Sequence, residues 1–145
     1  MNASLIAYLD TKTATALLPQ GGQASCGFPS PAADFELPDL SIDELIGIKP
    51  SSSIFLLRAW GDSMREAGIF DGDVLVVDKA KEAKLNDIVV AILGAEFVVK
   101  RVIKDPAGQT LLKAENPSYA PIRLAEEETL DVWGVCVWVL HNLSD

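Results

Sequence analysis

The sequence predicts a mostly β protein, in which a curled antiparallel β domain with one short helix follows a flexible N-terminal arm. Two observations lead to this prediction. Short runs rich in Val, Ile, Leu and aromatic residues recur from residue 54 onward, separated by turn sequences that contain glycine, and one helical signal precedes them. We expect strands at residues 54–60, 74–78, 88–93, 97–103, 110–114 and 132–140.

Local signals define the helix and one hairpin. Ser41-Ile42-Asp43-Glu44 has the form of a capping box, with Gly47 and Pro50 as stop signals. Gly94-Ala95 joins two predicted strands with glycine in the first central position, which is typical of a type II′ turn. We therefore expect one short helix just after residue 41 and a tight hairpin at residues 94–95.

The first 37 residues have no comparable pattern. Apolar residues are scattered between positions 5 and 18, and Pro19 and Gly21-Gly22 follow them. We interpret residues 1–37 as an arm and residues 38–145 as the β domain. The arm is too short for a helix-turn-helix unit with its own core, which argues against a DNA-binding repressor.

Composition excludes several classes of function. Acidic residues outnumber basic ones by 21 to 12, and the net charge of -9 argues against direct nucleic-acid binding. The two cysteines, Cys26 and Cys136, lack the spacing of a zinc site or a disulfide framework, so we expect no metal and no cofactor. The sequence shows no signal peptide and no apolar run of about 20 residues, and a soluble, cytoplasmic protein is expected.

A serine in the turn Gly61-Asp62-Ser63-Met64 is the first candidate for catalysis. A serine hydroxyl is a weak nucleophile until a base removes its proton. The only histidine, His141, lies four residues from the C-terminus, and Lys100 on a predicted strand is the better candidate for the base. The backbone N–H groups of Ser63 and Met64 are candidate donors to an oxyanion.

Lys100 can act as a base only in its neutral form. Strand alternation places Val98, Lys100 and Val102 on one face and directs Arg101 to the other. Burial on that apolar face would have to lower the lysine pKa from about 10.4 to about 7, which corresponds to roughly 4 to 5 kcal/mol. The alternative is a lysine whose ammonium group reaches water, the common case for a lone lysine in a strand.

The segment from Ala24 to Asp34 contains Cys26-Gly27 followed by Pro29 and Pro31. Prolines favour an extended backbone, and a narrow extended peptide is what a protease cleft accepts. Judged on local sequence alone, an ordinary linker is the more common interpretation. Cys26 is also a candidate thiol nucleophile, but no histidine lies near it in the sequence.

Several motifs taken together resemble the LexA-like family of self-cleaving Ser/Lys peptidases. They recur in the family's order with compatible spacing, including 37 residues from Cys26 to Ser63 and another 37 from Ser63 to Lys100. The resemblance covers the chain from Cys26 onward. It rests on residues 26–34, 61–64, 71–73, 96–100, 115–122 and 129–135.

This resemblance implies a LexA/signal-peptidase-like β fold with Ser63 as the nucleophile, Lys100 as the general base and Cys26-Gly27 as the scissile bond. It implies that a RecA filament on single-stranded DNA stimulates self-cleavage in the SOS response to DNA damage. The product would be a homodimer and the accessory subunit of an error-prone translesion DNA polymerase, bound to a Y-family catalytic subunit. Removal of residues 1–26 would convert the full-length chain into this accessory subunit.

Other residues have competing interpretations. Cys136 in the last predicted strand is most simply a core or interface residue. Trp133 and Trp138 have opposite parity in that strand, so we expect both of its faces to be buried, one of them against a second subunit. Asp71 and Asp73 fit turn chemistry better than a metal site, because no third ligand has suitable spacing.

Two other functions remain open at this point. One is a non-enzymatic β interaction module whose arm regulates binding. The other is a signal-peptidase-like enzyme that acts on other proteins, although such an enzyme would normally need a membrane anchor. The order of the motifs favours the self-cleaving peptidase over both.

Overall fold

The computed structural model describes residues 1–9, 17–19, 39–47, 53–123 and 130–144. The chain forms two compact units, one of residues 10–51 and one of residues 1–9 together with 52–145. In the smaller unit, β2 (Leu17–Pro19) pairs antiparallel with β3 (Asp39–Ser41), and α1 (Ile42–Leu45) follows. The Ser41 hydroxyl accepts a 3.1 Å hydrogen bond from the Glu44 N–H, so the predicted helix cap is confirmed.

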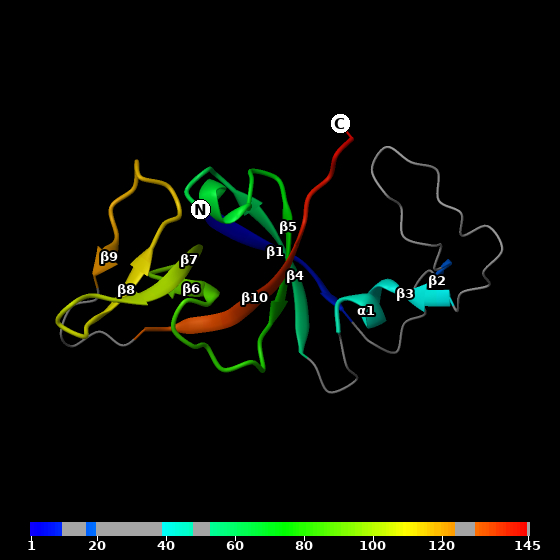
Figure 1. Cartoon of the computed structure of the whole chain (residues 1–145), viewed down its shortest axis with the longest axis horizontal. Helices are drawn as coiled ribbons and strands as arrows, with labels where there is room; N and C mark the ends of the chain where they lie inside the picture. Colours follow the sequence, from blue (N-terminus) through cyan, green and yellow to red (C-terminus); the bar gives the residue numbers. More distant parts are fainter. Residues whose placement is uncertain (10–16, 20–38, 48–52, 124–129, 145) are drawn as a thin grey trace, which may run out of the picture. The chain divides into compact units, whose positions relative to one another are not determined.

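The larger unit contains one eight-stranded sheet, with the strand order β1-β4-β5-β10-β6-β7-β8-β9 (Figure 1). Every pairing in it is antiparallel, and β1 also pairs with β7, so the sheet closes on itself. The mostly β prediction is confirmed. The strands are β1 (Asn2–Leu9), β4 (Ile54–Trp60), β5 (Val74–Asp78), β6 (Ile88–Leu93), β7 (Glu96–Lys104), β8 (Thr110–Lys113), β9 (Ile122–Arg123) and β10 (Val132–Leu140).

The six strands expected from the sequence are all present. Four of them, β4, β5, β6 and β10, have the predicted bounds; β7 is one residue longer at each end, and β8 ends one residue earlier. Gly94 in the β6–β7 hairpin has φ +61°, the left-handed angle that a type II′ turn requires at that position. Sequence reasoning missed β1, β2, β3, β9 and a short 3₁₀ helix, η2 (Arg65–Ala67).

The N-terminal residues differ most from expectation. Residues 2–9 were expected to form no element, but they form β1 and belong to the larger compact unit. The expected division places the arm and the cleavage segment in residues 1–37 and the peptidase-like β domain in residues 38–145, with a cut between residues 26 and 27. The compact units do not test this division, so it stays a prediction.

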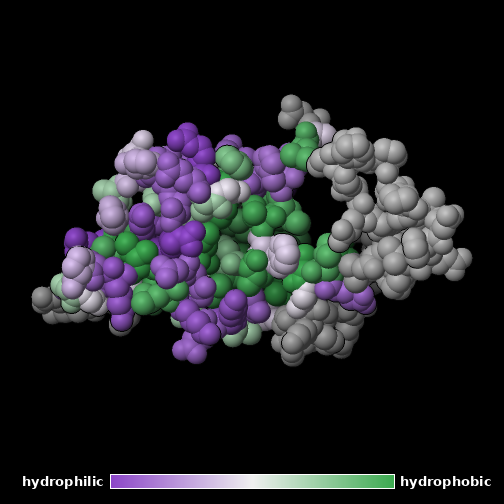
Figure 2. Space-filling model, viewed as in Figure 1, coloured by the Kyte–Doolittle hydropathy of each residue, from purple (hydrophilic) through white to green (hydrophobic). Residues whose placement is uncertain are grey.

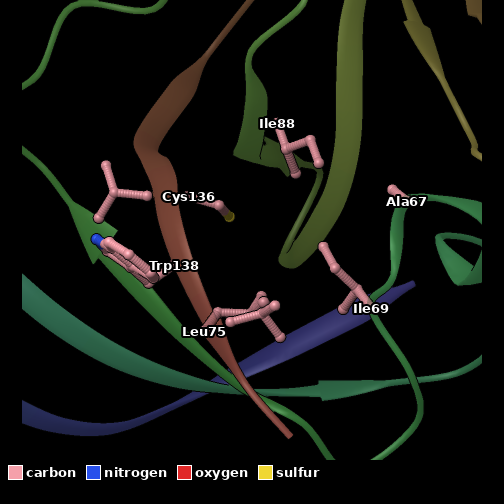
Figure 3. A pocket seen from close by; sticks show the side chains of 8 residues that line it. Ala67, Ile69, Leu75, Ile88, Cys136 and Trp138 are labelled. Carbon is pink, nitrogen blue, oxygen red and sulfur yellow. The ribbon is translucent and has the colours of Figure 1, made fainter. Parts of the chain in front are cut away.

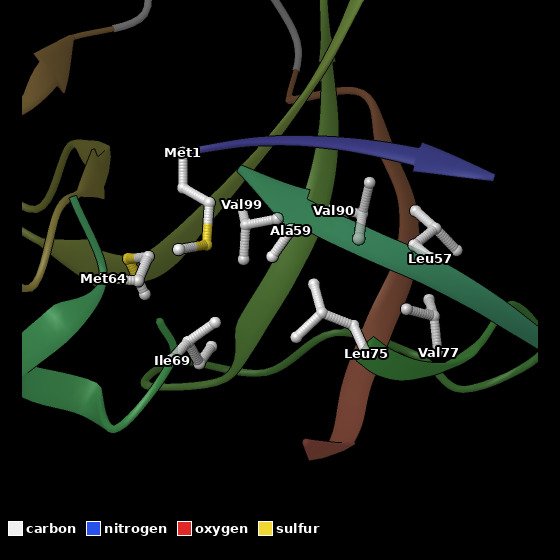
Figure 4. Packing of buried hydrophobic residues seen from close by; sticks show 9 residues of the cluster. All are labelled: Met1, Leu57, Ala59, Met64, Ile69, Leu75, Val77, Val90 and Val99. Carbon is white, nitrogen blue, oxygen red and sulfur yellow. The ribbon is translucent and has the colours of Figure 1, made fainter. Parts of the chain in front are cut away.

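The buried hydrophobic side chains of the larger unit form two clusters. The first combines residues of β4, β5, β6 and β7 with Met1, Met64 and Ile69 (Figure 4). The second contains Val89, Ala91, Val98, Val102, Leu112 and Val135. Residues of both parities in β7 are buried, so this strand lies between the two clusters and its middle is shielded from water.

Strand β10 crosses between β5 and β6 and pairs with both. Trp133 packs its ring against Phe55 and Phe97, at centroid distances of 4.9 and 5.0 Å. Trp138 is 46 % exposed, so the expected burial of both strand faces is not complete within one chain. Figure 2 shows hydrophobic residues across the middle of the face seen in Figure 1, between hydrophilic margins.

No helix within the residues that the structure describes is long and apolar enough to cross a membrane.

Candidate active site

Ser63 lies in a turn directly after β4. Gly61 begins this turn with φ +96°, a left-handed angle that favours glycine, and its N–H donates to Asp71 Oδ1 over 2.7 Å. The side chain of Met64 is fully buried, and its carbonyl accepts a 3.3 Å hydrogen bond from the Ile69 N–H. Because both ends of the turn are fixed, Ser63 is held in place with 1 % of its surface exposed.

Lys100 reaches Ser63 from the middle of β7. Its Nζ donates a 2.8 Å hydrogen bond to Ser63 Oγ. Lys100 is 6 % exposed, and its neighbours on the same strand face, Val98 and Val102, are buried as well. The structure thus brings together the two side chains that the sequence singled out, in buried and largely apolar surroundings.

Arg101 points away from Lys100, as strand alternation predicted. Its Nε donates to Glu115 Oε1 and its Nη1 donates to the Asn86 carbonyl, both over 2.5 Å. The Glu115 carbonyl accepts a 2.9 Å hydrogen bond from the Glu66 N–H. Arg101 therefore ties β7 to neighbouring loops and takes no part in the pair formed by Ser63 and Lys100.

Residues from the β8–β9 loop hold Asp62, the residue before Ser63. Asn116, which is 4 % exposed, donates from Nδ2 to the Asp62 carbonyl over 3.0 Å. The Tyr119 phenol donates to Asp62 Oδ1 over 2.5 Å, and this bond raises the pKa of Tyr119. The Tyr119 ring centroid lies 5.8 Å from Lys100 Nζ. The sequence indicated residues 115–122 of this loop as a family motif, but it predicted no role for Asn116 or Tyr119.

The backbone around Ser63 leaves donors available. Within the described part of the chain, the N–H groups of Ser63 and Met64 donate to no other group. Unpaired backbone N–H groups beside a nucleophile are what an oxyanion site needs. Their role as oxyanion donors stays a prediction, because their aim depends on where a substrate carbonyl lies.

Met1 adds a further group that the sequence did not suggest. Its α-amino group donates a hydrogen bond to Ser63 Oγ, and its carbonyl accepts one from the Val99 N–H over 2.8 Å. Burial and, to a smaller extent, the neighbouring Lys100 together lower the pKa of this amino group from 8.0 to about 5. The start of the chain thus lies directly against the Ser63–Lys100 pair.

The aspartates of the Asp71-Gly72-Asp73 turn have structural partners. Besides the bond from Gly61 to Asp71, the buried Asp73 accepts from the Phe70 N–H over 2.8 Å. Asp73 Oδ1 lies 2.5 Å from Nδ1 of His141, the histidine that the sequence made a weaker candidate for the base than Lys100. Among the described residues, no three His, Cys, Asp or Glu side chains come close enough to hold a metal ion.

Of the two cysteines, Cys136 lies within the described residues and Cys26 does not. The predicted cleavage site, Cys26-Gly27, lies outside the described residues. Cys136 is partly buried and lines an apolar pocket of about 150 Å³ with Leu75, Ile88 and Trp138 (Figure 3). Burial raises the pKa of its thiol to about 12. This cysteine therefore has the character of a packing residue.

Comparison with known proteins finds a LexA repressor and the shorter proteins SamA and ImpA among the similar chains. The LexA repressor of Delftia acidovorans is 41 % identical over 130 residues, which are 87 % of this chain and 55 % of that protein, so this chain spans about half the repressor's length. Protein SamA of Salmonella typhimurium is 41 % identical over 116 residues, covering 80 % of this chain and 79 % of SamA. Protein ImpA of Escherichia coli is 35 % identical over 123 residues, covering 85 % and 82 %.

The sequence pattern of one protein family matches most of the chain. This pattern, described as Peptidase S24-like, matches residues 19–137. The match contains both Ser63 and Lys100 and agrees with the similarity to the LexA repressor. The resemblance inferred from the motifs is therefore confirmed. The chain belongs to the Peptidase S24-like family of serine peptidases.

Proposed function

We propose that the chain cleaves its own Cys26-Gly27 bond, with Ser63 as the nucleophile and Lys100 as the general base. The observation that carries this proposal is the 2.8 Å hydrogen bond between Lys100 Nζ and Ser63 Oγ, made by two side chains that are almost completely buried. A lysine acts as a general base in its neutral amine form, so the proposal assigns that form to Lys100 in the reaction. Membership of the Peptidase S24-like family supports the class of reaction.

In this mechanism, neutral Lys100 takes the hydroxyl proton of Ser63 while Oγ attacks the carbonyl carbon of Cys26. The backbone N–H groups of Ser63 and Met64 stabilise the resulting oxyanion. The Lys100 ammonium then protonates the nitrogen of Gly27, and the peptide bond breaks. Water deprotonated by Lys100 hydrolyses the ester between Cys26 and Ser63, which releases residues 1–26 and restores both side chains.

The cellular role that we propose follows from the resemblance to self-cleaving proteins of the SOS response. A RecA filament on single-stranded DNA stimulates the cut in the cytoplasm. The remaining residues 27–145 form a homodimer that serves as accessory subunit to a Y-family translesion polymerase. The net charge of -9 supports contact with DNA through these partners rather than directly.

The chemistry is tested by intact mass spectrometry of the purified chain, incubated from pH 7 to pH 10 with and without a RecA filament. We expect a product that begins at Gly27 and forms faster as pH rises. Ser63→Ala and Lys100→Ala should abolish it, and so should Lys100→Arg, because arginine keeps its proton. Lys104→Ala, at the exposed end of the same strand, is the matched control and should cleave at the parental rate.

The same experiment separates the competing functions. Cleavage of Ser63→Ala or Lys100→Ala at the parental rate would show that the catalytic assignment is wrong. A chain that never cleaves would be the non-enzymatic interaction module. Cleavage that a RecA filament leaves unchanged would refute the proposed regulation while the Ser/Lys chemistry stands.

A further inference from the structure

Residues 1–9, which we call the N-terminal segment, lie in the sheet beside the proposed catalytic pair. Strand β1 pairs with β4 from end to end, and Asn2 also lies opposite Val98 of β7. Ser63 follows the last residue of β4, and Lys100 lies in the middle of β7. The N-terminal segment is therefore held between the two strands that position the catalytic side chains.

Met1 fills the space in front of Ser63. Its backbone nitrogen donates to Ser63 Oγ, and its carbonyl is held by the Val99 N–H. Its side chain is 8 % exposed and packs in the same hydrophobic cluster as Met64 (Figure 4). A scissile carbonyl must come to about 3–3.5 Å from the attacking oxygen. No peptide can reach Ser63 in this way while Met1 stays in place.

The contacts of the N-terminal segment are those of a bound peptide. An extended peptide that adds a strand to an exposed sheet edge is held mainly through backbone hydrogen bonds. The segment runs antiparallel to β4 and contacts β7 through the backbone groups of Met1 and Val99. Because backbone groups are common to all sequences, another extended segment can make the same contacts.

Beyond Met1, part of the N-terminal segment is exposed to solvent. Leu5 and Ile6 are 53 % and 45 % exposed, although both are large apolar residues. The pairing with β4 shifts register between Leu5 and Ala7, so a bulge interrupts the ladder. Exposed apolar side chains such as those of Leu5 and Ile6, together with an interrupted ladder, are features of elements that open locally.

We propose that the facing edges of β4 and β7 form the peptide-binding groove of this peptidase, and that the N-terminal segment is its resident, displaceable occupant. This inference rests on the proposed self-cleavage. The segment around Cys26-Gly27, from the same chain or a second copy, binds in the groove only after the N-terminal segment has left. The observed cleavage rate is then the intrinsic rate multiplied by the fraction of molecules whose groove is open.

The length of the chain allows this exchange. Sixteen residues lie between Leu9 and Cys26, and this length of chain can span up to about 60 Å when extended. Strand β1 itself, with eight residues, is only about 26 Å long. The chain between Leu9 and Cys26 is therefore long enough for Cys26 to reach Ser63.

A disulfide that locks the N-terminal segment tests the proposal. Ala3 lies opposite Ala59, whose N–H bonds to the Asp73 carbonyl and whose carbonyl accepts from the Gly72 N–H. Ala59 thus directs its backbone groups toward β5, and Ala3–Ala59 is a non-hydrogen-bonded pair with an expected Cα separation of about 4.5 Å, within the range of a disulfide. The full chain carrying Ala3→Cys and Ala59→Cys is oxidised, its crosslink is verified by peptide mapping, and cleavage is followed by intact mass.

The oxidised double variant should cleave at least about tenfold more slowly than its reduced form, and reductant should restore the rate. The control is Ala59→Cys alone, whose rate should not depend on the same oxidant. Equal rates for oxidised and reduced double variant would overturn the inference while the peptidase assignment stands. If parent and reduced variant both fail to cleave even at high pH, the proposed function itself is wrong.

A second pair of variants tests release rather than locking. Ser4 is next to Ala3, so its N–H faces β4, and Ser4→Pro removes that donor. Ser4→Ala keeps the N–H and loses only the hydroxyl that accepts from Trp60 Nε1 over 3.4 Å. Ser4→Pro should cleave about tenfold faster than the parent without RecA, and Ser4→Ala should stay within about twofold. A folded Ser4→Pro variant that cleaves no faster than Ser4→Ala would also overturn the inference.

Discussion

The Tyr119 phenol donates a 2.5 Å hydrogen bond to the carboxylate of Asp62, which lies 57 positions earlier in the sequence. Asp62 is the residue directly before Ser63. The backbone carbonyl of the same aspartate accepts from Asn116. The β8–β9 loop therefore fixes the turn of the nucleophile from the outside, while Met64 anchors it in the core.

Removing the Tyr119 hydroxyl should slow self-cleavage without unfolding the protein. Tyr119→Phe keeps the ring beside Lys100 and deletes the bond to Asp62. If this hydrogen bond holds Ser63 in its reactive position, its loss should slow the reaction several-fold. Intact mass gives the rate, and thermal unfolding provides the control, because the midpoint should shift by no more than a few degrees. An unchanged rate would show that Tyr119 does not position the nucleophile.

Gly134 in β10 should tolerate no side chain. A Cβ atom at this position would lie 2.5 Å from Cγ1 of Val77, a buried residue of β5. Overpacking of this kind costs about 1–3 kcal/mol of unfolding free energy, which urea denaturation of Gly134→Ala measures. Val77→Ala removes the colliding atom, so the double variant should be more stable than the sum of the single effects predicts. Strict additivity would contradict the predicted collision.

Cys136 should react very slowly with alkylating agents in the folded protein. Burial raises the pKa of its thiol to about 12, whereas an ordinary cysteine has a pKa of about 8.5. At pH 8, only about one thiol in 10⁴ is then the reactive thiolate. The Cys26→Ser variant leaves Cys136 as the single thiol, and mass spectrometry with iodoacetamide should show labelling about 10³-fold slower than for a free thiol. Labelling in denaturant is the control, and fast labelling of the folded chain would refute the prediction.

The sequence predicted the strands and residues whose signals are local. Strands β4, β5, β6 and β10 are predominantly apolar runs because they face the core on one or both sides, and their bounds follow from composition. Ser63 and Lys100 could be selected because few residue types perform this chemistry. The Ser41 cap was predictable because its partner lies three residues away.

Other features depend on contacts that a sequence does not display. Strand β1 is held largely by backbone pairing, and Leu5 and Ile6 are both exposed, so no alternating pattern marks it as a strand. Tyr119 and His141 contact partners 57 and 68 residues away, and their residue types fit many surface positions. Only the folded chain shows that Tyr119 contacts the residue before Ser63.

The Met1 amino group makes the docking of the N-terminal segment depend on pH. Burial and the neighbouring Lys100 lower the pKa of this group from 8.0 to about 5 in the docked segment. Between these two pH values, the released segment binds a proton that the docked segment does not. Docking is therefore fully favourable above pH 8, weakens as pH falls from 8 toward 5, and changes no further below the pKa of the docked form.

Hydrogen exchange measures this dependence directly. Protection factors of β1 amides, corrected for the intrinsic pH dependence of exchange, should fall by on the order of a hundredfold between pH 8 and pH 5.5. Amides of β5 (Val74–Asp78) in the same molecule are the internal control and should keep their protection, because they lie in the buried core. N-terminal acetylation removes the ionisable group and should abolish the dependence. A constant ratio of β1 to β5 protection over this range would show that the amino group ionises alike in both states, and hence that it is not buried against Ser63.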